Sequence, residues 1–343
     1  DLEGRKESVV LFRAHHSMAD GVSLGAAFSD LCDEAETIRN FLVTEIKKRG
    51  GKGKKAKTLL SKLSSWLQRI LYFCLGSFQS LLDHAYLTLT TPRNPFADYL
   101  LKNDVSANRS VSWCEVAPVD EARAVAKTLH PTATINDLFV ACVAAAIRRQ
   151  LKEHSLSSSS TVAVPSSVNV VIPVHLAGGV LPPGTEMGNK IGAMVARIPL
   201  TSSPSSDHFS NVSDALTRKK RSLAPLIGHL LARFSSDHLP PSLTKFLFRN
   251  TNANAAAVVT NVRGTEYKMH WDGRTVESVV GFLPLPPGVP VGVCVQSYAG
   301  VMSVSVTAER GAVPDADRFL GWVVEEYRGL CDRARGVRGG EVE

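Results

Sequence analysis

The stretch Ala14-His15-His16-Ser17-Met18-Ala19-Asp20-Gly21 follows an apolar run at residues 9–12 and precedes a helix-like segment at residues 22–35. It places two histidines, an aspartate and a glycine in one short turn between two elements that both look buried. A polar turn carried between apolar elements is typical of a site of chemistry. We therefore take this stretch as the candidate active-site motif.

The two histidines cannot both face the same cleft. Adjacent side chains of an extended strand point to opposite faces, so one of His15 and His16 is a candidate base. Histidine titrates near neutrality and can take a proton from a hydroxyl and return it to a leaving group. Asp20 is expected to fix the loop through an ion pair or backbone hydrogen bonds. Gly21 is expected to supply a positive φ or a close backbone approach.

Two other interpretations of the motif compete with the base. A histidine in an apolar setting can be a structural residue with satisfied hydrogen bonds. A metal site is the second alternative, because His15, His16 and Asp20 could offer two nitrogens and an oxygen. Adjacent strand residues diverge, however, and no other cluster of cysteine or histidine completes a ligand shell. The sequence therefore favours a general base and predicts no metal.

The motif has the form H-H-x-x-x-D-G and resembles that of the CoA-dependent acyltransferases built like chloramphenicol acetyltransferase. Four further features occur in order along the chain, and they are most similar to the plant-type members of the wax ester synthase/diacylglycerol acyltransferase (WS/DGAT) family. They are Thr134-Ile135-Asn136-Asp137, the strand from Asn169 to Pro173 with Gly188-Asn189-Lys190-Ile191-Gly192, Thr260-Asn261-Val262-Arg263-Gly264, and Ser297-Tyr298-Ala299-Gly300. The resemblance covers about residues 5–330.

The chain departs from the family pattern in two places. The family has a proline after the glycine at 264, where this chain has Thr265. Family members also place a long segment with a P-L-W sequence before the two histidines, whereas this chain reaches His15 after fourteen residues. The resemblance therefore implies a fragment in which the N-terminal lobe is incomplete.

The resemblance implies a two-lobed α/β acyltransferase fold with mixed sheets. It implies that acyl-CoA enters one end of a channel as co-substrate, and that a long-chain alcohol or diacylglycerol enters the other. His16 would be the base, with His15 and Asp20 beside it in the motif, and no acyl-enzyme or cofactor is needed. Thr260 and Asn261 are candidate oxyanion donors or substrate contacts.

The Asn136-Asp137 pair has two interpretations. An Asn-Asp pair at the start of a helix is first of all a cap or a loop anchor. The same pair, as part of the family motif, is also a candidate for direct contact with substrate. Both interpretations stay open at the level of the sequence.

The composition predicts a globular protein. With 343 residues, 44% of them hydrophobic and 21% charged, the chain can bury sizeable cores in two lobes. We divide it into an N-terminal lobe remnant (1–46), a basic linker with an amphipathic segment (47–105), a C-terminal lobe (106–333) and a loose tail (334–343). The six cysteines lack C-x-x-C spacing and are expected to be reduced thiols in a cytosolic environment.

The segment from 47 to 90 combines charge and apolar periodicity. A basic, glycine-punctuated run at residues 47–57 precedes apolar residues that recur at three- and four-residue steps from 59 to 85, which predicts an amphipathic helix. Such a combination suits an anionic lipid surface and argues against nucleic acid. The interruptions by polar residues argue against a transmembrane span. The alternative is that this apolar face packs against the protein core.

Periodicity also predicts the remaining elements. Strands are expected at 110–116, 168–174, 191–199, 256–262, 276–282, 292–298 and 301–308, and helices at 119–129, 136–154, 209–227 and 315–333.

The sequence thus predicts an acyl-CoA-dependent O-acyltransferase that makes wax esters or triacylglycerol on the cytosolic face of the endoplasmic reticulum or on lipid droplets, and that is not secreted. One alternative is a catalytically inactive protein that binds lipid surfaces. The other is an acyltransferase of the same fold with a different alcohol or amine acceptor.

Overall fold

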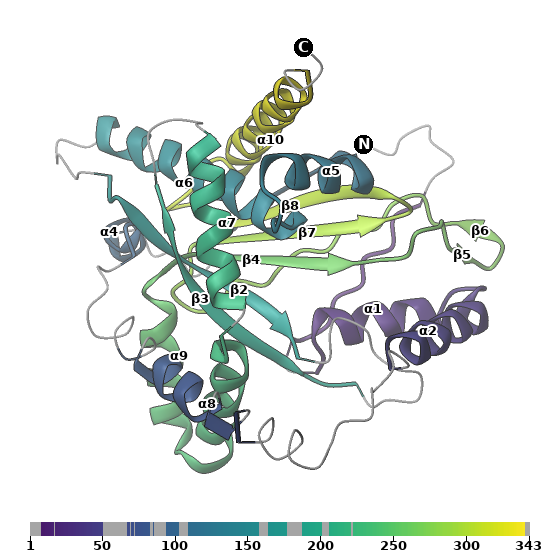
Figure 1. Cartoon of the computed structure of the whole chain (residues 1–343), viewed down its shortest axis with the longest axis horizontal. Coiled ribbons are helices and arrows are strands. Elements are labelled where there is room, and N and C mark those ends of the chain that lie inside the picture. The colour runs from purple at the N-terminus through teal and green to yellow at the C-terminus, as the bar shows by residue number, and fades with distance from the viewer. Residues whose placement is uncertain are drawn as a thin grey trace.

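A six-stranded mixed sheet forms the centre of the molecule (Figure 1). The computed structural model describes residues 8–16, 18–50, 67–68, 70–71, 73–82, 85, 94–102, 109–157, 164–176, 187–200, 206–220 and 222–339. In spatial order the strands are β1 (Arg109–Pro118), β8 (Val301–Glu309), β7 (Val291–Tyr298), β4 (Ala255–Arg263), β2 (Ser167–His175) and β3 (Ile191–Pro199). The predicted α/β class with a mixed sheet is confirmed.

The pairing of the strands explains why the sheet is mixed. β4 lies between β2 and β7 and is parallel to both, whereas β1, β8 and β3 pair antiparallel to their neighbours. β7 and β8 form a hairpin whose two turn residues, Ala299 and Gly300, both have positive φ, at 48° and 77°. A turn of that hand matches the right-handed twist of the strands.

Four helices cover one face of this sheet and close the main core: α5 (Val119–Leu129), α6 (Ile135–Ser157), α7 (Ser206–Lys220) and α10 (Ala316–Gly339) (Figure 1). α6 is the most deeply buried of them, because alanines and cysteine along its middle let neighbouring helices approach closely. Phe139 of α6 stacks on Tyr327 of α10 with ring centroids 5.6 Å apart. The helix predicted at 315–333 continues to Gly339.

The helix predicted at 209–227 is wrong in extent, because it is two helices. α7 ends at Lys220, and α8 (Ala224–His238) begins a new direction with Pro225 in its first turn. Proline has no backbone N–H and is tolerated there but not inside a helix. A further helix that the sequence reading missed, α9 (Pro241–Asn252), follows α8.

Gly192 of β3 makes a close contact with α8. A Cβ atom added at this glycine would lie 2.1 Å from the carbonyl oxygen of Pro225, whereas one added at Gly188 would have no neighbour within 4 Å. We expect Gly192→Ala to lower the free energy of unfolding by about 3 kcal/mol, because backbone must move to relieve the overlap. Denaturant unfolding measures the loss, with Gly188→Ala as the matched control from the same motif. Equal stabilities of the two variants would contradict the expectation.

Two apolar segments differ from the expectation. Residues 9–12, which the sequence suggested were a buried element, form no helix or strand, and their side chains are more than half exposed. A short hairpin of β5 (His270–Trp271) and β6 (Arg274–Thr275) precedes residues 276–282, which form no strand. That segment lies across the face of the sheet instead, where the carbonyl oxygen of Gly281 accepts a hydrogen bond from Ser305 Oγ at 2.5 Å.

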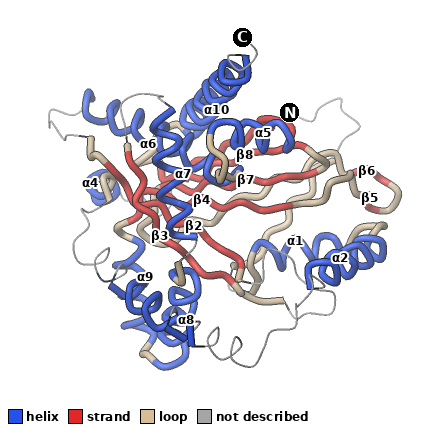
Figure 2. The backbone as a smooth tube through the Cα atoms, viewed as in Figure 1, coloured by secondary structure: helices blue, strands red, loops and turns tan. Residues whose placement is uncertain are grey.

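The N-terminal part of the chain packs at one end of the sheet, as the tube trace shows (Figure 2). The helix predicted at 22–35 is α1 (Gly21–Asp30), which a turn separates from α2 (Ala35–Gly50). In that turn, both carboxylate oxygens of Asp33 accept hydrogen bonds from the backbone of the β5–β6 hairpin, from Asp272 and Gly273. Glu34 accepts a hydrogen bond from the backbone N–H of His270 at 3.0 Å and bonds the His270 ring at 2.5 Å, and these two contacts, the backbone one first, lower the pKa of its carboxyl group.

The amphipathic segment is helical wherever it is described. All described positions between 67 and 82 are helical, and a Cβ added at Gly76 would lie 3.1 Å from Leu223, just before α8. The basic run at 51–57 lies outside the described residues. A short helix, α4 (Ala97–Lys102), follows the segment. Among the described residues, no helix is both long and apolar enough to cross a bilayer.

Candidate active site

The motif loop ends in a well-defined helix start. Asp20 is fully buried and is the N-cap of α1, where its Oδ1 accepts a hydrogen bond from the backbone N–H of Ser23 at 2.8 Å. An aspartate satisfies a free N–H in the first turn and also favours the positive end of the helix dipole. Local sequence therefore sets where α1 begins and how the loop enters it.

A second segment, residues 188–190, binds this loop from far along the chain. The N–H of Asp20 donates to the carbonyl oxygen of Gly188 at 3.1 Å, and Ser23 Oγ donates to the same oxygen at 3.0 Å. The N–H of Lys190 donates to Asp20 Oδ2 at 2.9 Å. The Asn189 side-chain amide donates to the carbonyl oxygen of His16 at 2.9 Å. The G-N-x-x-G segment thus positions the histidine motif, and we call this set of contacts the loop clamp.

His175 is the residue of this site that the sequence reading left unassigned. It ends β2, its side chain is nearly buried, and its Nε2 lies 3.6 Å from Asp20 Oδ2. The Asp20 carboxylate therefore has two backbone donors and a neighbouring imidazole. A histidine that ends a buried strand shortly before the G-N-x-x-G segment was the signal available in the sequence.

The two motif histidines have different surroundings. His15 is exposed, and its carbonyl oxygen accepts the N–H of Met18 at 2.9 Å in a tight turn. His16 is half-buried, and no described residue makes a hydrogen bond or ion pair with its imidazole. The clamp holds the backbone of His16 through the hydrogen bond from Asn189.

Gly21 brings α1 against the sheet. A Cβ added there would lie 3.5 Å from Val262 of β4, which is ordinary contact distance, and Gly21 is not among the residues with positive φ. Close approach is therefore the reason for a small residue here. Gly264, at the end of the same strand, is tighter, because a Cβ there would lie 2.2 Å from the carbonyl oxygen of Ser297 in β7. Its N–H donates to that same oxygen at 2.9 Å.

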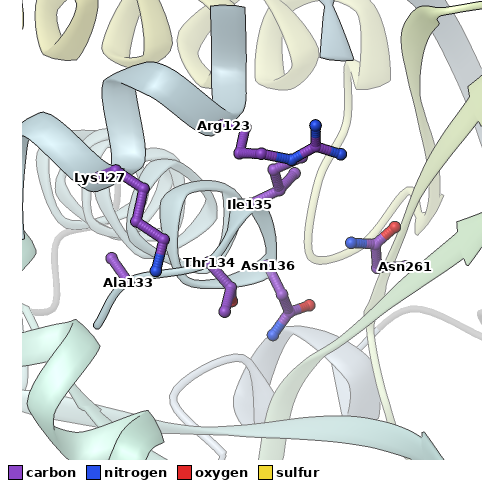
Figure 3. A pocket seen from close by; sticks show the side chains of 7 residues that line it. All are labelled: Arg123, Lys127, Ala133, Thr134, Ile135, Asn136 and Asn261. Atoms are coloured by element: carbon purple, nitrogen blue, oxygen red, sulfur yellow. The ribbon is translucent and has the colours of Figure 1, made fainter. Parts of the chain in front are cut away.

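Asn136 and Asn261, from separate sequence motifs, line one pocket (Figure 3). The pocket has a volume of about 330 Å³ and is lined by Arg123, Lys127, Ala133, Thr134, Ile135, Asn136 and Asn261. Asn261 and Val262 are successive strand residues, so their side chains point to opposite faces of β4. The structure thus places Asn261 in the pocket and leaves Thr260, His15 and His16 outside its lining.

Asp137 has a structural role in the same region. Its Oδ2 accepts hydrogen bonds from the N–H and the hydroxyl of Thr134 at 2.9 and 3.0 Å, and its Oδ1 pairs with Lys220 at 2.5 Å. The carboxylate is completely buried. These contacts fix the start of α6, where Asn136 then points into the pocket (Figure 3).

The thiols show no sign of activation. All six cysteines are free, and burial raises the pKa of Cys142 and raises that of Cys294 to about 12. A thiol with such a pKa stays protonated at neutral pH and is a poor nucleophile. Among the described residues, no group of three or more His, Cys, Asp or Glu side chains is arranged to hold a metal ion.

Solved structures with low sequence identity share the fold. The epimerization domain from the third module of tyrocidine synthetase B is 13% identical over 94% of this chain and 69% of its own, with a TM-score of 0.52. The likeness confirms the predicted fold, which is that of condensation domains and chloramphenicol acetyltransferase-like proteins. The WS/DGAT from Marinobacter aquaeolei VT8 is 18% identical over 75% of this chain, which spans 56% of that one, with a TM-score of 0.47.

Sequence comparisons point to one family. Wax ester synthase/diacylglycerol acyltransferase 2 from Arabidopsis thaliana is 23% identical over 94% of this chain and 69% of its own length. The family model described as the WS/DGAT C-terminal domain matches residues 187–330, a range that includes residues 188–190 of the loop clamp, Asn261 and Gly264. Residues 187–330 are therefore similar to the C-terminal domain of the wax ester synthase/diacylglycerol acyltransferases, and most of the chain is similar in sequence to one curated protein of that name.

Proposed function

We propose that the protein is an acyl-CoA-dependent O-acyltransferase that esterifies a long-chain alcohol or diacylglycerol. The observation that carries this proposal is the motif loop: the clamp holds the His16 backbone by a hydrogen bond from Asn189, while no described residue bonds the His16 ring. A rigid support with a free imidazole is what a general base needs. The name of the Arabidopsis relative supports the choice of substrates.

The proposed reaction transfers the acyl group directly from CoA to the acceptor in two steps, through a tetrahedral intermediate. His16 takes the proton from the acceptor hydroxyl as its oxygen attacks the carbonyl carbon of the thioester. The carbon–sulfur bond of the intermediate then breaks, and His16 returns the proton to the departing CoA thiolate. The products are an ester and CoA, and His16 is neutral again, so no acyl-enzyme forms.

The oxyanion of the intermediate needs hydrogen-bond donors that are already in place. Asn261 and Asn136 offer side-chain amides from two different elements that converge on the pocket (Figure 3). Loss of one such donor typically lowers the rate by about 10²- to 10³-fold. We assign Asn261 as the first donor to test, because its side chain lines the same pocket as that of Asn136.

Radiolabelled acyl-CoA tests the proposal directly. The purified chain is incubated with the labelled donor and, in separate reactions, with a long-chain alcohol, diacylglycerol or a long-chain amine. Ester formation with either hydroxyl acceptor supports the proposal, and a preference for the amine would assign a different acyltransferase of the same fold. No transfer to any acceptor by the folded chain would contradict the proposal.

A second candidate function, binding to a lipid surface, is favoured by a specific feature. Large apolar side chains are exposed on the helical positions 67–82 and on α8 and α9, which lie together below the sheet (Figure 1). They are Leu67, Ile70, Leu71, Phe73, Leu75, Phe78, Leu81, Leu82, Leu230, Leu231, Phe234, Leu243, Phe246, Leu247 and Phe248. We call this set the apolar helical surface. Lys245 and Arg249 on α9 add positive charge, which favours anionic lipid.

Flotation with vesicles tests this surface. We expect the chain to float with vesicles that contain anionic phosphatidylserine, and the double substitution Phe234→Glu/Phe246→Glu to reduce the bound fraction at least tenfold. Each phenylalanine buries apolar area in the lipid, and each glutamate adds repulsion from the anionic headgroups. Leu156→Glu, at an exposed leucine near the end of α6, is the matched control. An unchanged bound fraction in the double variant would contradict a role for α8 and α9.

A further inference from the structure

We propose that Arg123 and Lys127 of α5 bind phosphate groups of the acyl donor at the mouth of the pocket. The proposal rests on the proposed function, because it takes the donor to be a CoA thioester. In this proposal α5 recognises the acyl donor, whereas the motif loop transfers the proton.

The two cationic side chains are placed to act on one ligand. They are four residues apart on α5 and therefore lie on the same side of that helix, beside its buried face of Ala122, Val125 and Ala126. Both line the pocket together with Asn136 and Asn261. In Figure 3, Lys127 extends toward Thr134, and Arg123 extends toward the side on which Asn261 lies. A ligand in the pocket would meet positive charge on one side and amide groups on the other.

Arg123 and Lys127 make only weak contacts in this structure, so a bound anion could replace their present partners. Arg123 pairs with Asp120 at 2.7 Å, but the two side chains are 59% and 91% exposed, and exposed pairs of this kind contribute little to stability. Lys127 Nζ donates to the carbonyl oxygen of Pro131 at 3.0 Å, a neutral acceptor that leaves its charge uncompensated. The nearby Asp137 carboxylate is neutralised by Lys220. The local charge is therefore suited to an anion.

Phosphate is the anion that this pair of residues fits. A guanidinium can offer two parallel N–H donors to two oxygens of one phosphate, and an ammonium provides a compact point charge for a second contact. Thioesters of CoA carry phosphates at one end and the reacting carbonyl at the other. With the phosphates held at α5, the remaining chain of the donor could extend along the pocket to Asn261.

An anionic lipid headgroup presents the same phosphate chemistry, so the test separates the two sources. CoA, dephospho-CoA and an acyl-pantetheine without nucleotide phosphates are titrated against the chain by calorimetry, and vesicles that contain phosphatidylserine are tested by flotation. The double variant Arg123→Gln/Lys127→Gln removes both charges at exposed positions. Arg335→Gln is the matched control, because Arg335 also pairs with an aspartate three residues before it.

We expect the double variant to bind CoA about 100-fold more weakly, since two charge-assisted hydrogen bonds are lost. Its affinity for acyl-pantetheine and its unfolding midpoint should equal those of the control. Unchanged CoA affinity in the double variant would overturn the inference and leave the proposed function intact. Loss of vesicle binding with unchanged CoA affinity would assign the pair to lipid headgroups and overturn it too. Absence of CoA binding and of acyl transfer in the unmodified chain would overturn both proposals.

Discussion

His16→Ala is expected to lower the rate of ester formation from acyl-CoA by about 10³-fold while the chain remains folded. A positioned general base contributes about 10²- to 10⁴-fold to a proton-transfer step, and alanine leaves no group to take the acceptor proton. The imidazole makes no hydrogen bond or ion pair with a described residue, so its removal leaves no partner unsatisfied among those residues. The measurement is transfer of a radiolabelled acyl chain, with an unfolding curve for each variant.

His15→Ala is the control for His16→Ala, because it removes the same side chain one residue away. His15 is exposed and its backbone, not its ring, closes the tight turn with Met18. We expect this variant to lose less than tenfold in rate. A similar loss in both variants would mean that the turn as a whole, and not the His16 ring, sets the rate. A rate for His16→Ala within tenfold of the unmodified chain would refute His16 as the base.

Most of the helices and strands could be predicted from the regular spacing of apolar residues along the sequence. The helix predicted at 119–129 has the observed bounds of α5, and the strand predicted at 191–199 has those of β3. In both, the apolar residues that repeat with the expected period are the buried ones. Local sequence is a sufficient guide where an element buries one face and exposes the other.

The errors arose where tertiary contacts decide the outcome. Residues 276–282 have the apolar content of a strand, but their backbone crosses the face of the sheet near Gly281 and Gly292 and finds no edge to pair with. Residues 9–12 are equally apolar, yet no described strand pairs with them. Whether an apolar segment forms a β-strand depends on a partner strand, and the sequence of the segment alone does not determine whether one is available.

The sequence predicted the chemical type of the candidate site, but it did not predict which distant residues contact the motif. The H-H-x-x-x-D-G motif pointed to a base and a loop anchor, and the structure places Asp20 in contacts that fix the loop. His175 could not be found from spacing, because it reaches Asp20 through the pairing of β2 with β3. Arg123 and Lys127 resembled ordinary surface charges until α5 was placed beside Asn136 and Asn261.

Asp20→Asn is expected to lower both stability and rate, with a loss of about 3 kcal/mol in the free energy of unfolding. The carboxylate is fully buried and accepts hydrogen bonds from the backbone N–H groups of Ser23 and Lys190. An asparagine can accept with one oxygen, but its NH₂ group would then face the second N–H donor or His175. An unsatisfied buried donor costs about 1–3 kcal/mol, and loss of the charge beside His175 adds to that cost.

The rate should fall because Asp20 positions the base without touching it. Lys190 and Asn189 are consecutive residues, so weakening the Lys190–Asp20 bond loosens the segment that also holds the carbonyl oxygen of His16. A displacement of about 1 Å at a catalytic group can cost about 10²-fold in rate, so we expect kcat to fall by that factor. The apparent KM for acyl-CoA should change little, because the clamp contacts involve neither Arg123 nor Lys127.

Asp315→Asn separates this effect from ordinary helix capping. Asp315 also accepts the N–H of the residue three positions on, Arg318, at 3.0 Å, but it is exposed and belongs to α10. Because asparagine caps a helix about as well as aspartate, this substitution should change the free energy of unfolding by less than about 1 kcal/mol and leave kcat unchanged. Rates are compared at a temperature at which both variants are folded. Because both substitutions keep one cap acceptor, a kcat loss confined to Asp20→Asn identifies the clamp as the source, and equal kcat values would reduce Asp20 to a helix cap.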